Sequence, residues 1–313
     1  MGYWREVREM YLQYYLEQLG YSEMPEFLVK YLKAPSLLRL KKIGYFCGMD
    51  YASKDIYKFR EYISRYDHSL TVSLIVYKLT KSKEATLAGL FHDIATPCFA
   101  HVIDYMNGDY EKQESTEEYT EAILSKDKYL LSCLKKDNID ISDVTDFKKY
   151  TIVDNDRPKV CADRVDGVIL TGIGWTKNIN LNDIKDIVFA MRIYKNEEDE
   201  DEIGFESLEI AKMIVDINRV IDKYCHSDED NYMMQLLAKI TKLAIDNHYI
   251  LYDDLYRTDE EMLFNLFHKI DDDKIKELIY EFENKKRKDI PKVNLPNVKV
   301  RKLNPLVNGM RIK

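Results

Sequence analysis

The stretch AGLFHDIATP, residues 88–97, ends an apolar helix with an imidazole and a carboxylate side chain. Pro97 predicts that the helix breaks after Thr96, because the residue before a proline avoids the helical region. An ionised Asp93 at the end of an apolar helix is costly unless it is paired or bound to a metal. We therefore interpret His92 and Asp93 as candidate metal ligands.

Two more candidate ligands lie in other predicted helices. His68 begins an apolar helix predicted over residues 68–80, and Asp163 lies within an amphipathic helix predicted over residues 158–171. Imidazole and carboxylate ligands together suit Mn, Fe, Zn, Mg or Ni, and they leave coordination positions open for water. These residues are therefore candidates for a site that holds one divalent metal.

The composition favours a mainly α-helical fold. Of 313 residues, 45% are apolar, which is enough for a large core, whereas only 11 are Gly and 7 are Pro. Sandwiches and barrels need many tight turns, so the scarcity of turn formers argues for helices. Helices are predicted over residues 4–19, 25–33, 36–44, 68–80, 84–93, 98–107, 114–126, 127–136, 158–171, 207–225, 229–247, 259–267 and 272–284.

A small β-hairpin and an extended tail complete the expected fold. Residues 187–194 are rich in β-branched and aromatic side chains and predict a strand, with the acidic run 197–202 as the turn before a returning strand at Phe205. Residues 285–313 alternate in hydrophobicity after the last helix and predict an extended tail. We expect one domain over residues 1–284 and a separate basic tail over residues 285–313.

Charge is distributed unevenly between these two parts. The tail has a net charge of +9, which leaves −17 on residues 1–284 of a chain whose total is −8. An acidic body argues against a general nucleic-acid binder. We interpret the tail as solvated or in contact with another subunit; phosphate binding by its cations is the alternative.

The sequence also favours a cytoplasmic protein. The N-terminus has charges and no apolar run typical of a signal peptide, and no apolar stretch approaches the length that spans a bilayer. The five Cys residues are scattered and lack CxxC spacing, which suits a reducing compartment.

The candidate ligands lie in a longer pattern that resembles a known family. The pattern comprises PSLLRL (residues 35–40), Gly48, RYDHSLTV (65–72), AGLFHDIATPCFAH (88–101) with Asp104, and ADRVD (162–166). It resembles the HD superfamily of metal-dependent phosphohydrolases, whose ligands follow the order H…HD…D, and within it the deoxynucleoside triphosphate triphosphohydrolase branch. The resemblance implies an HD-domain helical bundle, homo-oligomerisation, and a metal site made by His68, His92, Asp93 and Asp163.

The resemblance also implies residues that bind the substrate. Arg65 and Arg164 would contact phosphate, because a guanidinium group can bind two phosphate oxygens at once. Tyr224 and His226 lie where the branch has a Tyr-x-His that reaches phosphates. Structural ion pairs are the alternative for both arginines, with Asp67 or another acid for Arg65, and with Asp163 or Asp166 for Arg164.

Several positions depart from the branch pattern. Thr96 replaces a His that contacts the scissile phosphate, and Gln113 replaces a later His; neither side chain titrates near neutrality, so neither can act as a general acid. Further departures fall at three positions where the branch has sugar contacts: Tyr45, Gly167 and Thr171.

Three residues of the same stretch are candidates for the general acid or base. They are His101, Asp104 and Glu114, because burial near a metal can raise the pKa of a carboxyl group enough to relay a proton. The alternatives are a hydrogen bond between His101 and Asp104, three residues apart on a helix, and a helix-capping role for Glu114.

We expect a phosphohydrolase that cleaves a phosphoester or phosphoanhydride of a nucleotide-like substrate with metal-activated water. The alternative is a non-catalytic sensor that binds a nucleotide in the same pocket, since two histidines of the branch are replaced.

Overall fold

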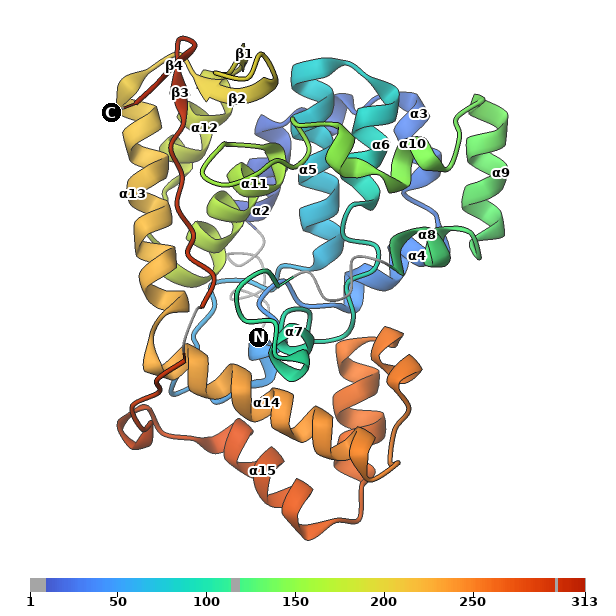
Figure 1. The fold of residues 1–313 in the computed structure, drawn as a ribbon, viewed down its shortest axis with the longest axis vertical. Helices are drawn as coiled ribbons and strands as arrows, with labels where there is room; N and C mark the ends of the chain where they lie inside the picture. Colours follow the sequence, from blue (N-terminus) through green and yellow to red (C-terminus); the bar gives the residue numbers. More distant parts are fainter. Residues whose placement is uncertain (1–9, 114–118, 296–297, 313) are drawn as a thin grey trace.

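The structure, a computed structural model, describes residues 10–113, 119–295 and 298–312 and is mainly α-helical (Figure 1). Its helices are α2 (Met10–Gln18), α3 (Glu26–Tyr31), α4 (Pro35–Arg39), α5 (Arg65–Thr80), α6 (Lys83–Phe91), α7 (Val102–Asn107), α8 (Thr120–Leu124), α9 (Lys128–Asp137), α10 (Ser142–Thr145), α11 (Ala162–Thr171), α12 (Leu181–Ala190), α13 (Leu208–Cys225), α14 (Asp228–Asp246) and α15 (Asp273–Asn284). The predicted fold class is therefore confirmed.

Helices α5 and α6 form the centre of the molecule (Figure 1). A capping box begins α5, in which Ser64 and Asp67 each accept a hydrogen bond from the backbone N–H of the other. Only Lys81 and Ser82 separate the two helices, so α6 runs back along α5 and its C-terminus lies beside the N-terminus of α5. Every residue of α5 from position 68 to 76 is buried, which explains why this helix is apolar on all sides.

The predicted strand over residues 187–194 is wrong in its first half. Residues 187–190 belong to helix α12, and the strand β1 begins only at Met191 (Met191–Lys195). Helix α12 begins at Asn180, whose side chain forms a capping box with Asp183. Ile184, Ile187 and Val188 are buried at helical spacing, and this tertiary burial outweighs the local preference for strand.

The small sheet has the strand order β1-β2-β3-β4. Strand β2 (Asp201–Phe205) returns antiparallel to β1, as predicted, and pairs on its other side in parallel with β3 (Leu306–Val307), which turns into β4 (Met310–Arg311). A Cβ atom at Gly204 would lie 2.6 Å from the carbonyl oxygen of Leu306, so this close strand pairing needs glycine.

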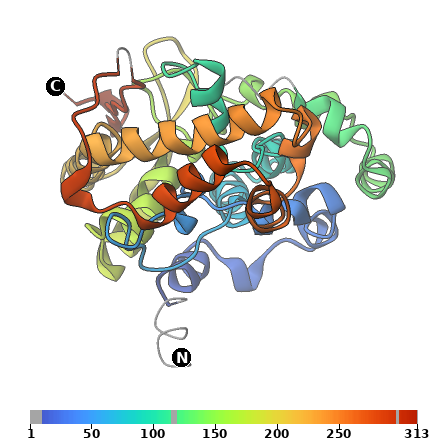
Figure 2. The same ribbon diagram turned by 90° about the horizontal axis from the view of Figure 1, so that it is seen from below.

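The extended C-terminal segment packs against the same chain. It runs along α13 to the sheet (Figures 1 and 2), and the side chains of Val298, Leu303 and Leu306 are buried. Its backbone N–H groups at Arg301 and Asn304 donate to Asp222 Oδ1 (2.7 Å) and to the carbonyl oxygen of Pro158 (2.9 Å). Apolar alternation in the tail is thus explained within one chain, and homo-oligomerisation stays a prediction.

None of the helices over the described residues combines the length and the apolar composition needed to cross a bilayer.

Candidate metal centre

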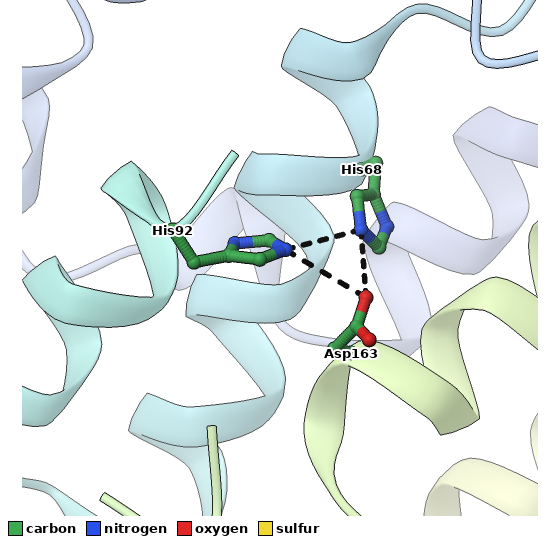
Figure 3. Close-up of side chains that lie close together, drawn as sticks. All are labelled: His68, His92 and Asp163. Atoms are coloured by element: carbon green, nitrogen blue, oxygen red, sulfur yellow. Dashed lines mark hydrogen bonds and ion pairs between the residues drawn. The ribbon is translucent and has the colours of Figure 1, made fainter. Parts of the chain in front are cut away.

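Three helices bring His68, His92 and Asp163 together at one point (Figure 3). His68 lies in the first turn of α5, His92 directly follows α6, and Asp163 lies in the first turn of α11. The Nε2 atoms of the two histidines are 3.2 Å apart, and Asp163 Oδ1 lies 3.1 Å from His68 Nε2 and 3.7 Å from His92 Nε2. The antiparallel packing of α5 and α6 therefore joins two ligands that are 24 residues apart in the sequence.

Hydrogen bonds on the outer edges of both rings determine which nitrogen faces the centre. His92 Nδ1 lies 2.8 Å from the carbonyl oxygen of Gly89, which can only accept, so Nδ1 carries the hydrogen. His68 Nδ1 lies 2.7 Å from Asp166 Oδ2, and the Asp166 carboxylate also accepts from the hydroxyl of Tyr15 (2.7 Å). When the two rings are neutral, as ligands of a metal must be, each therefore presents the lone pair of Nε2 to the centre.

This donor set fits a divalent metal. Two nitrogen lone pairs and a carboxylate oxygen face one another, an arrangement that needs a cation between them. Ligand atoms about 2.1 Å from a metal lie roughly 3.0–3.4 Å from each other, close to the observed separations. Burial lowers the pKa of His68, but its hydrogen bonds with Asp163 and Asp166 outweigh burial and raise the pKa to about 10. The centre thus attracts positive charge strongly.

Asp93 lies at the edge of this centre beside Arg65. Its carboxylate oxygens are 3.7 Å from His68 Nε2 and 3.8 Å from His92 Nε2, and Oδ2 accepts from Arg65 Nη1 at 2.8 Å. Burial raises the pKa of Asp93, but the cationic Arg65 and the two imidazoles outweigh it and hold the pKa below its usual range. Asp93 is therefore an ionised carboxylate in reach of the metal position, and its role as a ligand stays a prediction.

Arg65 is also oriented toward the cavity that contains the metal centre. The residue is buried, its guanidinium lies 5.0 Å from the ring of Tyr45, and its Nε has no hydrogen-bond acceptor among the described residues. A buried N–H without an acceptor is rare in proteins. This free donor beside the centre suits the predicted contact with a phosphate oxygen.

Arg164 has a different environment. Its guanidinium donates to Asp154 Oδ1 (3.1 Å), to the carbonyl oxygen of Lys159 (2.9 Å), and to the side-chain and backbone oxygens of Asn155. These bonds hold the loop that precedes α11. Arg164 therefore forms a structural ion pair, but its partner is Asp154 and neither Asp163 nor Asp166. Phosphate binding by Arg164 stays a prediction.

A second group of ligand atoms adjoins the first. Asp154, Cys161 and Asp163 each place one ligand atom within 4.8 Å of the others. Arg164 already pairs with Asp154, and burial raises the pKa of the Cys161 thiol well above its ordinary value. A protonated thiol and a paired carboxylate are poor metal ligands, so this group supports the loop rather than a second metal.

His101 and Asp104 form a hydrogen-bonded pair, with His101 Nδ1 2.9 Å from Asp104 Oδ2. His101 lines the large cavity and, together with Asp104 and Thr96, a small cavity of about 40 Å³ next to Asp93. The carbonyl oxygen of Thr96 accepts from Arg39 at 2.8 Å. The expected structural bond of His101 is therefore present, and it leaves Nε2 of the ring available for chemistry.

Residues 65–146 match the family profile of the HD domain. This part of the chain is therefore similar to an HD domain. The matched region contains His68, His92 and Asp93, whereas Asp163 follows it in the sequence. The "Uncharacterized protein YdhJ" of Bacillus subtilis (strain 168) is similar to this chain, with 28% identity over 207 residues. The aligned region covers 64% of this chain and 60% of the length of that protein. An HD domain indicates a superfamily of metal-dependent phosphohydrolases and no particular nucleotide.

The candidate metal centre opens into a cavity of about 1280 Å³. One part of its wall is aromatic, where Phe46 and Phe59 stack at 4.4 Å and Trp175 packs against both. Another part is cationic and includes Arg157 and Arg301. The wall of this cavity thus combines aromatic and cationic side chains.

Two of the predicted substrate residues do not line this cavity. Tyr224 packs against Trp175 at 5.6 Å and is 42% exposed, and His226 Nδ1 lies 2.7 Å from the carbonyl oxygen of Asp222 at the end of α13. Cys225 lines the cavity instead, because neighbouring residues of a helix point about 100° apart. Glu114, the third candidate proton donor, lies outside the described residues.

Sequence reasoning did not identify Asp166 as a partner of His68 or Arg157 and Arg301 as cavity residues. A signal for Asp166 exists, since it lies three residues after Asp163 on the same helix face. No sequence signal joins Arg157 to Arg301.

Proposed function

We propose that this chain is a metal-dependent phosphohydrolase that cleaves a phosphoester or phosphoanhydride bond of a nucleotide-like substrate. The observation that carries the proposal is the pair of inward-facing Nε2 atoms, 3.2 Å apart beside Asp163, at the edge of a cavity that Arg65 also lines. The HD domain supports the hydrolytic chemistry, and the aromatic wall supports a substrate with a planar group.

His68, His92, Asp163 and, at the edge, Asp93 would hold one divalent metal. When bound there, such a metal would lower the pKa of a water molecule and polarise a phosphoryl oxygen. Arg65 would stabilise negative charge on the phosphate, because its Nε is unpaired and its Nη1 is fixed by Asp93.

His101 is our candidate for the group that gives a proton to the leaving oxygen. Asp104 fixes the ring through Nδ1, so the other nitrogen is the one available for proton transfer. Gln113 cannot take this role, since it does not titrate and its Oε1 accepts from Arg301 at 3.1 Å.

The test is phosphorus NMR of a pool of deoxynucleoside triphosphates, nucleoside triphosphates, nucleoside monophosphates and cyclic nucleotides incubated with protein and Mn²⁺. Wild-type protein is expected to release a new phosphate species, and Asp93→Ala and His92→Ala are expected to abolish it. His268→Ala is a matched control, because this histidine pairs with Glu283 on the surface. Bound metal is measured in every variant by elemental analysis.

Three outcomes separate the alternatives. Tripolyphosphate release indicates triphosphohydrolase chemistry, and orthophosphate release or ring opening indicates another nucleotide substrate. Full metal retention without turnover of any compound contradicts the hydrolase proposal and favours a nucleotide sensor, a reading supported by the Thr at position 96 and the Gln at position 113.

A further inference from the structure

We propose that Arg157 and Arg301 form a second anion-binding subsite in the cavity, so that the substrate carries a second phosphoryl group beyond the one at the metal. This inference rests on the proposed function and adds the substrate class to it. Its starting point is two arginines, 144 positions apart in the sequence, that line one cavity without a carboxylate partner.

Arg157 has an unpaired guanidinium group. Among the described residues, none accepts a hydrogen bond from its side chain or forms an ion pair with it, although the residue is only partly exposed and lines the cavity. Arginine side chains in such positions normally satisfy several of their five donors. The free donors of Arg157 are therefore available to a ligand.

Arg301 is held in place by neutral groups. Its guanidinium donates to the carbonyl oxygen of Lys299 (3.1 Å) and to Gln113 Oε1 (3.1 Å). Its backbone is fixed on both sides, because the N–H donates to Asp222 Oδ1 and the carbonyl oxygen accepts from the Asn218 side chain. The position of Arg301 is thus determined by its backbone and by uncharged acceptors, and no carboxylate of the described residues forms an ion pair with its guanidinium.

The two arginines belong to segments that are directly joined. The N–H of Asn304 donates to the carbonyl oxygen of Pro158 at 2.9 Å, which places the C-terminal segment beside the loop that contains Arg157. Burial lowers the pKa of Arg157, and the nearby positive charges of Arg164 and Arg301 lower it further. Like charges that line one cavity repel one another, so an anion between them would relieve this repulsion.

Carboxylates of the cavity do not pair directly with the two arginines, although the charge of Asp230 contributes to raising the pKa of Arg301. Asp156 and Asp230 line the same cavity, yet within the described part of the chain neither forms an ion pair with Arg157 or Arg301. One oxygen of Asp230 already accepts from the hydroxyl of Tyr57 at 2.7 Å. A tetrahedral oxyanion with several acceptor oxygens matches two guanidinium groups better than a single carboxylate does.

The loop of Arg157 also connects this subsite to the metal centre. Asp154, three residues before Arg157, has a ligand atom within 4.8 Å of that of Asp163, and Arg164 holds the loop between them. One wall therefore extends from the metal ligand to the two arginines. A compound with one phosphoryl group at the metal and another farther along the cavity would use both ends of this wall.

The test is titration calorimetry of the full chain, without added metal, against orthophosphate, pyrophosphate and tripolyphosphate at constant ionic strength. Wild-type protein is expected to bind pyrophosphate at least about tenfold more tightly than orthophosphate, because a charged hydrogen bond contributes roughly a tenfold change in affinity. Arg157→Gln and Arg301→Gln are each expected to lose about tenfold for pyrophosphate and little for orthophosphate. Arg219→Gln is the matched control, since this arginine is exposed on α13 and pairs only with Asp216.

Arg157→Gln removes no hydrogen bond of the described structure, so it should fold normally. Arg301→Gln removes the bonds to Lys299 and Gln113, so Arg301→Lys, which retains a cation, is measured beside it. Equal affinity of wild-type protein for orthophosphate and pyrophosphate would overturn the inference. So would unchanged pyrophosphate binding in Arg157→Gln. The titration measures anion binding and does not depend on hydrolysis. A negative result here therefore does not contradict the proposed metal-dependent hydrolysis, and a protein without hydrolytic activity can still bind pyrophosphate at this subsite.

Discussion

Asp166 Oδ2 lies 2.7 Å from His68 Nδ1, on the edge of the ring opposite the nitrogen that faces the metal position. A carboxylate in this place fixes the tautomer and the orientation of a ligating histidine and makes it a stronger ligand. Asp166 is fully buried, and its other oxygen accepts from Tyr15.

Asp166→Asn should therefore weaken Mn²⁺ binding by about 10- to 100-fold. Equilibrium titration of the metal measures this change, with Tyr15→Phe as a milder variant that removes only the donor to Asp166. Unchanged metal affinity in a folded Asp166→Asn protein would show that this carboxylate does not support the centre.

His101→Gln should lower kcat of the hydrolysis by about 100-fold or more, the usual contribution of a general acid. Burial lowers the pKa of His101 despite the opposing effect of Asp104, so the protonated ring is a minor form at neutral pH. The rate should then fall as the pH rises from 6 to 8, and this slope should disappear in His101→Gln. The measurement is a pH profile of kcat with a substrate found by phosphorus NMR. If His101→Gln keeps the same pH dependence, the titrating group is a residue other than His101.

The buried carboxyl group of Asp50 should make the stability of the fold depend on pH. Burial and the neighbouring Asp259 raise the pKa of Asp50 to about 7, and burial raises that of Asp259 to about 7 as well. The folded-state pKa lies above that of the unfolded chain, so this stabilising contribution is complete below the ordinary pKa of 3.8 and is lost progressively as the pH rises from there through about 7. Asp50 Oδ2 is buried without a hydrogen-bond partner among the described residues, whereas Asp259 accepts from the N–H groups of Gly44 and Phe99.

Asp50→Asn should accordingly raise the free energy of unfolding at both pH values, and the gain should be larger at pH 8 than at pH 5 by about 1 kcal/mol or more. Urea denaturation at both pH values tests this difference. The opposite order, with the larger gain at pH 5, would contradict the assigned direction of the shift.

Arg311 anchors the C-terminal segment to the sheet. Both of its Nη atoms donate to the carboxylate of Glu202 at 2.8 Å, and Glu202 is fully buried. Arg311→Gln leaves a buried charge without its partner and should reduce the free energy of unfolding by roughly 2–4 kcal/mol. Thermal and urea denaturation measure the loss. Glu197→Gln is the control, since Glu197 pairs with the same arginine but is exposed, and this substitution should reduce the free energy of unfolding much less than Arg311→Gln does.

Much of the helical fold can be predicted from the sequence because its signals are local. The helices at His68, at His92 and at Asp163 are marked by apolar spacing, by caps and by Pro97, and α5 through α6 follow the predicted ranges closely. Residues 187–190 were misassigned, since β-branched side chains favour a strand locally while the capping box at Asn180 and burial on one helix face favour α12.

The three residues that gather at the metal position could also be predicted, because each had a helical setting and a ligand side chain. Asp93 pairs with Arg65 at the edge of the centre. Tyr224 and His226 do not line the cavity, since their helix phase depends on how α13 packs. The proximity of Arg157 to the C-terminal segment arises only from tertiary contacts, such as the bond between Asn304 and Pro158, which no local pattern encodes.

Because the C-terminal segment forms part of the cavity wall, the cavity can be completed only at the end of synthesis. The ribosome releases His68, His92 and Asp163 well before it releases Arg301, so a nascent chain can assemble its metal ligands while one wall of its pocket is still missing. A chain cut after α15 would keep the metal ligands, yet it would lack Arg301 and the strands that anchor it. Proteolysis within this segment would therefore separate metal retention from substrate selectivity in a single molecule.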